Sequence, residues 1–185
     1  MVAPPPTPRR LTRDEYQRMG EIGIFDGERV ELIHGSLVRM APIGPPHANV
    51  VDRLNMLLAA RLAGRVRVRV QQPFLAADDS EPEPDVAVVA DVSHARSHPD
   101  RALLVVEVAQ SSLEYDRDTK APLYASSNVD EYWIVDIEGR AVLVHRQPEG
   151  GRWRSQTLVV PGEQITLLAF PDVVVVVAEL LSERD

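Results

Sequence analysis

Two uninterrupted apolar runs constrain the fold of this chain more than any other feature. The first is DVAVVA, residues 85–90, and the second is ALLVVEVA, residues 102–109. Runs of this length, without the polar alternation of a half-exposed strand, are typical of central strands covered on both faces. The sequence therefore predicts an α/β protein with these two strands in the middle of its sheet.

Hydrophobic periodicity around these runs predicts helices that could cover such a sheet. The apolar residues of segment 47–63 recur at three- and four-residue spacing, which indicates an amphipathic helix ended by Gly64. Segment 117–127 is predicted to form a second helix. Thr12 and Glu15 have capping-box spacing, which predicts a short helix near the N-terminus.

Further strands are predicted on both sides of the central runs. RVRVRV, residues 65–70, alternates as a strand with one wet face, and residues 30–40 read as a hairpin around His34-Gly35. Residues 131–147 predict two strands joined by a turn, and residues 152–170 one or two short strands. For residues 173–182, periodicity leaves both a last strand and a last helix open.

Composition limits the classes of protein to which the chain can belong. With 185 residues, 44% of them hydrophobic and 26% charged, we expect a disordered proline-rich tail over residues 1–10 and one domain over residues 11–185. The sequence contains no cysteine, so any metal must be held by oxygen or imidazole ligands. This composition permits a reducing compartment, and we expect the chain to be cytoplasmic. The longest apolar stretch, residues 170–181, carries Asp172 and Glu179 and is too short to span a membrane.

The charge pattern is less simple than the net charge of -8. That total argues against a protein that coats nucleic acid, because phosphate binding needs a basic footprint. Residues 53–72 nevertheless hold five arginines and no acid, whereas residues 78–91 hold six acids and no base. Two interpretations remain open, a basic strip beside an acidic pocket and an ordinary solvated charge pattern.

Two carboxylates belong to the predicted central strands. Asp85 opens the first run and Glu107 lies inside the second. A buried carboxylate costs several kcal/mol unless a partner compensates its charge. One explanation is a salt bridge from Glu107 to an arginine. The other is that the two acids share a hard cation, for which Mg²⁺ or Mn²⁺ would fit.

Lys120 is the single lysine of the sequence, and all the other basic side chains except histidine are arginines. An ammonium close to a phosphate can orient or deprotonate a water, or stabilise developing negative charge. The alternative is a surface lysine paired with Asp116, four residues earlier in the helix.

These segments resemble, in order, the Uma-type family of restriction-endonuclease-like proteins, a branch of the PD-(D/E)XK nuclease superfamily. The resemblance extends over roughly residues 11–170. The matching segments are VELIHGSLVRM (30–40), GPPHANVVDRL (44–54), PEPDVAVV (82–89), LLVVEVAQSS (103–112), DRDTK (116–120) and NVDEYWIVD (128–136).

The resemblance implies a fold, a cofactor and a set of site residues. The fold would be restriction-endonuclease-like, an α/β core with a mixed central sheet flanked by helices. Asp85, Glu107 and the backbone carbonyl of Val108 would bind Mg²⁺ or Mn²⁺, Glu31 would supply a further catalytic acid, and Lys120 would act beside them. The substrate would be DNA.

The sequence departs from the family pattern at three positions. Ala109 stands where the superfamily has its lysine, so Lys120 must reach the site from the following helix. Pro122 lies in that helix, where it removes an N–H group and clashes with the carbonyl four residues earlier, which puts this reach in doubt. Asn128 replaces a glycine, a mild change because asparagine tolerates the left-handed conformation of a helix stop.

The histidines and aromatic residues are weaker candidates. His47 opens the long helix, where N-terminal N–H groups can meet a phosphate; a substrate contact, a cap and a packing role all remain open. His34, His94, His98 and His145 lack ligand spacing and are expected at the surface. Tyr132 and Trp133 are expected to pack inside. Glu81 and Glu83 are expected to be solvated.

The sequence therefore supports two functions of different classes. The first is a Mg²⁺-dependent endonuclease that hydrolyses DNA phosphodiester bonds, which by analogy with other nucleases would act as a homodimer. The second is a binding or assembly module that has the nuclease fold without turnover. The acidic net charge and Pro122 favour the second.

Overall fold

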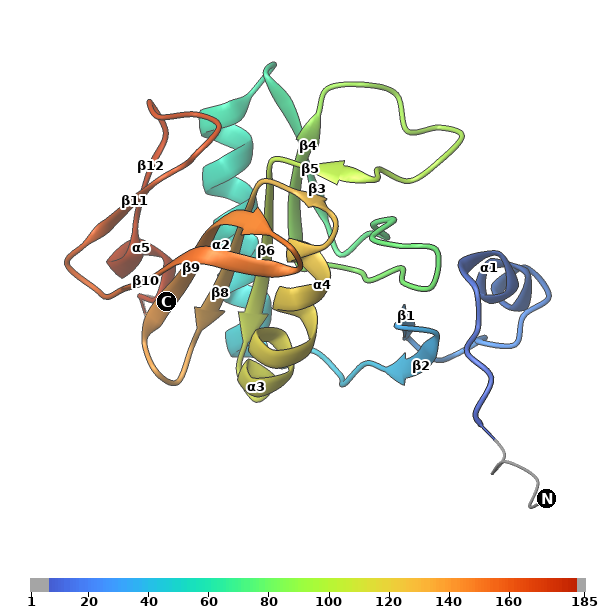
Figure 1. Cartoon of the computed structure of the whole chain (residues 1–185). Helices are drawn as coiled ribbons and strands as arrows, with labels where there is room; N and C mark the ends of the chain where they lie inside the picture. Colours follow the sequence, from blue (N-terminus) through green and yellow to red (C-terminus); the bar gives the residue numbers. More distant parts are fainter. Residues whose placement is uncertain (1–6, 183–185) are drawn as a thin grey trace.

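A six-stranded mixed sheet forms the centre of the protein, seen in a computed structural model that describes residues 7–182 (Figure 1). Its strand order is β10-β9-β8-β6-β4-β3. Neighbouring strands are antiparallel except β6 and β8, which are parallel. The strands of this sheet are β3 (Val66–Val70), β4 (Val86–Ala90), β6 (Leu104–Ala109), β8 (Glu131–Asp136), β9 (Ala141–Glu149) and β10 (Arg152–Val159). The predicted mixed sheet is thus confirmed, with β4 and β6 as interior strands.

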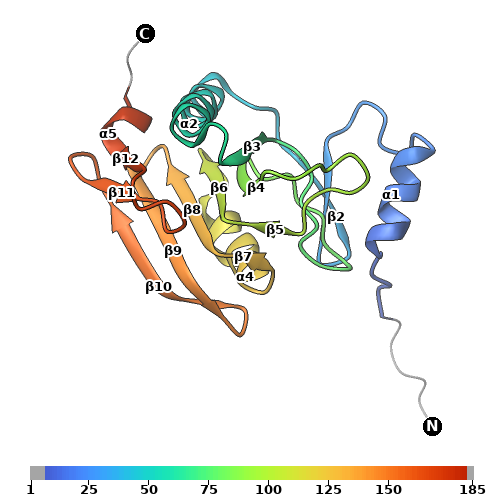
Figure 2. The same cartoon turned by 90° about the horizontal axis from the view of Figure 1, so that it is seen from above.

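Both faces of the sheet are buried, as the continuous apolar runs predict. Helix α2 (Pro45–Leu62) covers one face and packs on the even-numbered residues of β4 and β6. The opposite face, with the odd-numbered residues, is covered by the helical segment 113–125 (Figure 2). Because side chains alternate along a strand, each central strand contributes to two separate cores.

Helix α2 begins two residues before the predicted start. Pro45 and Pro46 occupy its first turn, where a missing N–H group costs nothing because it would have no helical partner. The helix ends before Gly64, which adopts a φ of +73°. The predicted N-terminal helix is α1 (Arg13–Glu21), with both hydrogen bonds of the Thr12–Glu15 capping box formed.

The second predicted helix is wound in two ways. It consists of α3 (Leu113–Tyr115), the π-helical turn η1 (Asp116–Lys120) and α4 (Ala121–Ala125). Pro122 lies in the first turn of α4, and Ala121 donates a backbone hydrogen bond to Asp116, five residues earlier. We attribute the wider turn to Pro122, whose ring would clash with the carbonyl of Asp118 in a regular α-helix.

The remaining elements surround the sheet. The hairpin β1 (Val30–Ile33) and β2 (Ser36–Arg39) turns at His34-Gly35 as predicted and lies beside α1 at one end of the molecule (Figure 1). The predicted run 102–109 is divided into β5 (Arg101–Ala102) and β6, and β5 pairs with β7 (Asn128–Val129). At the other end, β11 (Gln164–Thr166) pairs with β12 (Val174–Val176), which leads directly into α5 (Val177–Leu180). Residues 173–182 therefore contain both alternatives, a strand and then a helix.

The described segment 7–10 of the predicted tail is exposed and has no regular secondary structure, and residues 1–6 lie outside the described part. None of the helices in residues 7–182 is both long and apolar enough for a membrane span.

Candidate active site

Asp85 and Glu107 come together because of the register between β4 and β6. Ala87 pairs with Val105 in this antiparallel ladder. Two residues further along each strand, on the same face of the sheet, the same register places Asp85 opposite Glu107. Directly opposed residues have Cβ atoms about 5 Å apart. Both acids are buried, with 7% of Asp85 and 4% of Glu107 exposed. The register therefore places the two acids opposite each other on one face of the sheet.

The Asp85 carboxylate accepts a hydrogen bond from a β6 backbone N–H, that of Val108, which lies beyond the residues of β6 paired with β4. Its Oδ2 atom accepts a hydrogen bond from the Val108 backbone N–H at 2.8 Å and lies 3.0 Å from Nε2 of His47. Its Oδ1 atom accepts a hydrogen bond from Gln71 at 3.3 Å. In an extended strand the N–H and C=O of one residue point to the same side. The Val108 carbonyl therefore also points towards Asp85, just before the first residue of β4.

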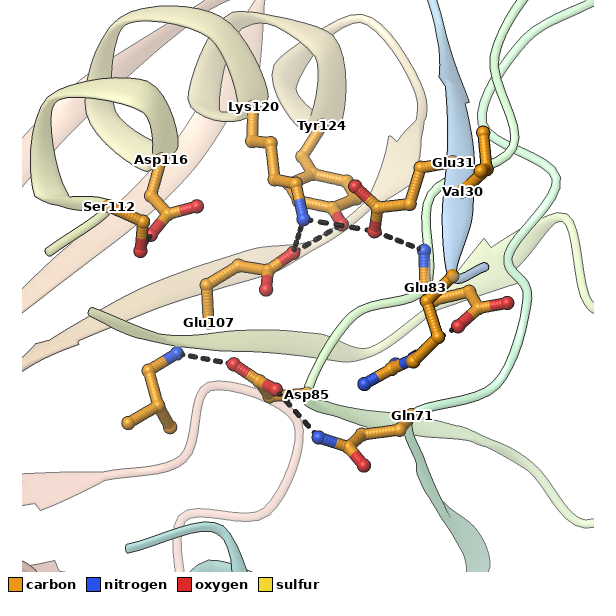
Figure 3. A network of polar contacts seen from close by, with 12 residues as sticks. Val30, Glu31, Gln71, Glu83, Asp85, Glu107, Ser112, Asp116, Lys120 and Tyr124 are labelled. Carbon is orange, nitrogen blue, oxygen red and sulfur yellow. Dashed lines mark hydrogen bonds and ion pairs between the residues drawn. The ribbon is translucent and has the colours of Figure 1, made fainter. Parts of the chain in front are cut away.

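Lys120 reaches the site despite Pro122. Its Nζ atom lies 3.0 Å from Oε1 of Glu107 and 3.1 Å from Oε1 of Glu31, and only 4% of the residue is exposed (Figure 3). The alternative of a surface lysine is therefore wrong. Burial disfavours its ammonium form, but the surrounding carboxylates, Glu107 first, outweigh burial and raise the pKa of Lys120.

Glu107 has Lys120 as its ion-pair partner, so the alternative of an arginine salt bridge is wrong. Tyr124 also donates a hydrogen bond to Oε1 of Glu107, at 2.8 Å. Both donors approach the same oxygen, which leaves Oε2 without a hydrogen bond from residues 7–182. Burial raises the pKa of Glu107 well above its ordinary value; Lys120 opposes this shift, and the nearby acids, Asp85 first, add to it.

Glu31 joins the site from the separate hairpin. Its Oε1 atom accepts hydrogen bonds from Lys120 and from the backbone N–H of Glu83, the latter at 2.7 Å (Figure 3). Only 2% of Glu31 is exposed. The hairpin and β6 therefore each supply one acid to the same buried ammonium.

Two further residues of the site carried no clear signal in the sequence. Gln71 follows β3 with a φ of +49°, a left-handed conformation that turns the chain beside Asp85. Asp116 is buried, accepts a hydrogen bond from Ser112 at 2.6 Å, and has a pKa raised by burial (Figure 3). The four-residue spacing from Asp116 to Lys120 was the available signal, but it suggested a surface pair.

Several expectations about flanking residues are corrected. Glu81 is not solvated: it is buried, bonded to Gln17, and joined to Leu32 by an isolated β-bridge. Glu83 is half-buried and pairs with Arg29. His145, a residue of β9, is also buried, because it packs beside Tyr132 and Trp153. Tyr132 and Trp133 pack inside as expected.

The acids line a pocket of about 330 Å³ between the hairpin, the loop 40–44 and the helical segment 113–125. Among residues 7–182, no group of three or more histidine, cysteine and acidic side chains is arranged to hold a metal ion. Mg²⁺ demands near-octahedral geometry but usually keeps several waters, so one or two protein carboxylates can hold it. Asp85, the free oxygen of Glu107 and the Val108 carbonyl are the atoms that suit it.

Comparison with known proteins identifies the family. The family model Uma2, described as "Putative restriction endonuclease", matches residues 13–181. Among solved structures, the fold is similar to that of a putative nuclease of DUF820 from Anabaena variabilis, with a TM-score of 0.74 and 14% sequence identity over 93% of this chain and 98% of that one. No curated protein matches the sequence. Because the family model covers most of the chain, this protein belongs to the Uma2 family.

Proposed function

We propose that this protein is a metal-dependent endonuclease that hydrolyses phosphodiester bonds in DNA. The observation that carries the proposal is the meeting of Asp85, Glu107 and Lys120 at one pocket. The chain also belongs to a family whose description is "Putative restriction endonuclease", which supports the same reaction. Water adds to phosphorus, one P–O ester bond breaks, and the products are a phosphate monoester and an alcohol.

The proposed metal site uses the atoms that the fold leaves available. Asp85, Glu107 and the Val108 carbonyl would hold Mg²⁺ or Mn²⁺. When bound, such an ion supplies Lewis-acid activation of the phosphate and of the attacking water. Gln71 and the Val108 N–H fix the orientation of the Asp85 carboxylate, and Tyr124 fixes that of Glu107.

Lys120 acts in this proposal as a cation and not as a base. Burial lowers the pKa of Lys120, but Glu107 and Glu31 raise it more, which favours the ammonium form. An ammonium at this position stabilises the negative charge that develops on the phosphate oxygens. Glu31 accepts a second hydrogen bond from Lys120, at 3.1 Å, and so positions it.

The test is cleavage of plasmid DNA and of single-stranded circular DNA in Mn²⁺ or Mg²⁺ by the variants Asp85→Ala and Glu107→Ala. Both are expected to lose cleavage by about 100-fold or more, because each loses a ligand of the activating ion. Both are also expected to lose the Mn²⁺-induced rise in melting temperature of the wild type. Asp91→Ala is the matched control: its carboxylate lies just past the opposite end of β4 and pairs with Arg67.

Undiminished cleavage by both variants would contradict the mechanism. Mn²⁺ binding in calorimetry without cleavage of any DNA would favour the alternative, a binding module with the nuclease fold. That alternative agrees with the net charge of -8. The proposed homodimer is tested separately, by light scattering with and without DNA.

A further inference from the structure

A second cavity of about 580 Å³ lies beside the pocket with the acids. Arg29 and segment 39–43 line both cavities, so the two share one wall. Gly27 and Glu28 also line the second cavity. A strand that occupied both cavities would pass Arg29.

The depth of the acid pocket limits the form of DNA that can reach it. Asp85, Glu107 and Lys120 are all at least nine-tenths buried. Duplex DNA is stiff, with a persistence length of about 50 nm, so a bend that brings one of its phosphates into the pocket costs free energy. An unpaired strand is flexible and avoids this cost. The deep site thus favours a strand that is not held in a double helix.

The charges near the pocket also suit a single strand better than a duplex. Duplex binding usually relies on a wide basic footprint, whereas a single strand needs a narrow groove that follows its backbone. Three arginines of the predicted basic strip are instead paired with acids, as Arg61–Glu179, Arg65–Asp172 and Arg67–Asp91. The two cavities present Arg29 and Arg39, which also have acidic neighbours, Glu83 at 3.1 Å and Glu28 at 4.0 Å.

Arg29 is the better placed of these two arginines. It lies two residues before Glu31, so both side chains point to the same face of the hairpin. Its guanidinium is partly exposed and pairs with Glu83 at 3.1 Å. An exposed ion pair of this kind contributes little to stability, so a phosphate can replace the carboxylate at low cost.

Two polar atoms in the pocket wall lack a partner within the described part of the chain. These are the hydroxyl of Tyr115 and Nδ1 of His47, both buried. A buried polar atom without a hydrogen bond costs about 1–3 kcal/mol, so such atoms point to a missing ligand. A phosphate oxygen or a sugar hydroxyl of a bound strand would satisfy them.

We propose that these two cavities form the binding groove for an unpaired DNA strand, with Arg29 on a phosphate beside the scissile one and Tyr115 donating to the bound strand. The inference rests on the proposed nuclease function and names its substrate class, single-stranded or flapped DNA. His47 is the second polar contact in this groove.

The experiment measures binding and cleavage of one fluorescein-labelled oligodeoxynucleotide in three forms: alone, as a flap, and annealed to its complement. Anisotropy in Ca²⁺ gives the dissociation constants, and cleavage in Mn²⁺ gives kcat and KM. The variants are Arg29→Gln and Tyr115→Phe. Arg67→Gln is the matched control, because Arg67 is another partly exposed arginine paired with one acid, Asp91, at 2.8 Å.

The free and flapped strands are expected to bind about tenfold or more tightly than the duplex. Arg29→Gln should weaken strand binding about fivefold and raise KM with little change in kcat, while Arg67→Gln stays within about twofold of the wild type. Tyr115→Phe should weaken binding about threefold without lowering the melting temperature, because its hydroxyl makes no hydrogen bond in the folded chain.

Equal or tighter binding of the duplex, or equal effects of Arg29→Gln and Arg67→Gln, would overturn this inference. Cleavage of a duplex would then leave the nuclease proposal standing. If Arg29 is needed for strand binding but no DNA is cleaved, the groove stands and the proposed function fails. If neither binding nor cleavage occurs, both fail.

Discussion

The ammonium of Lys120 lies between two buried carboxylates, and each of the three groups depends on the others. Burial raises the pKa of Glu107, and Lys120 is the partner that opposes this shift. Removing one member of a buried ion pair leaves an uncompensated charge, which costs more than the pair contributes. Lys120 therefore matters to stability as well as to the proposed chemistry.

We expect Lys120→Met to lower the free energy of unfolding by about 3–5 kcal/mol at pH 8, as for other broken buried pairs. The sign of the pH dependence follows from Glu107. Its raised pKa means that the folded chain binds more protons than the unfolded chain, so its effect on stability is most favourable below the ordinary value of 4.5 and is lost as pH rises. Without Lys120 this loss is larger, so the deficit of the variant should shrink from pH 8 to pH 5.

Urea unfolding at both pH values measures this deficit, with Lys120→Arg as the control that keeps the charge. A deficit that is equal at pH 5 and pH 8 would show that lost packing, and not the uncompensated carboxylates, destabilises the variant.

At the scale of elements, the hairpin β1–β2 carries Glu31 to the site, and its turn fixes the position of that acid. Gly35 has a φ of +72°, and a Cβ atom there would lie 2.4 Å from Cβ of Arg10. The turn is also held by hydrogen bonds from Gly35 N–H to Asp79 and from Leu11 N–H to the Gly35 carbonyl. A side chain at Gly35 therefore does not fit unless Arg10 or the hairpin moves.

We expect Gly35→Ala to cost about 2–4 kcal/mol and to weaken Mn²⁺ binding, because the clash displaces Glu31 and with it Lys120. Gly64→Ala is the control: it has a similar φ of +73° but open space around the added Cβ. Gly64→Ala should cost only the backbone strain, about 1–2 kcal/mol, and leave metal binding unchanged. Urea unfolding and calorimetry measure the two effects, and unchanged Mn²⁺ binding in Gly35→Ala would contradict the link between the turn and the site.

The elements that could be predicted from sequence are those with local patterns. The alternation of RVRVRV, the periodicity of segment 47–63 and the Thr12–Glu15 spacing each describe one element by itself. The wider turn before Pro122 could not be predicted, because a proline shows where a regular helix fails but not how the preceding turn rearranges. Glu81 and His145 were misplaced for a different reason: other segments bury them, and nothing next to them in the sequence indicates this.

At the scale of the whole molecule, an acidic protein with a net charge of -8 is proposed to bind a polyanion. Most of its surface charge must then repel DNA, and attraction is confined to the groove beside Arg29. Few phosphates are neutralised in such a complex, so few counterions are released on binding.

We therefore expect a shallow salt dependence of strand binding. The slope of log K against log salt concentration should lie between about -1 and -2, since each phosphate contact to a single strand contributes about -0.7. Arg29→Gln should reduce the slope by about 0.7, and Arg67→Gln should not change it. Anisotropy titrations over a range of KCl concentrations give these slopes, and a value near that of a wide basic interface, about -6 or steeper, would contradict a narrow groove.

The even-numbered and odd-numbered residues of β4 and β6 belong to different cores. The proposed chemistry therefore uses only the face of the odd-numbered residues. Asp85 and Glu107 are both odd. Inserting a single amino acid between Asp85 and Ala87 would turn Asp85 to the face of the even-numbered residues, away from Lys120, whereas inserting two would restore its direction. The site therefore tolerates insertions into this strand only if they add an even number of residues. The apolar character of the strand alone would not impose this constraint.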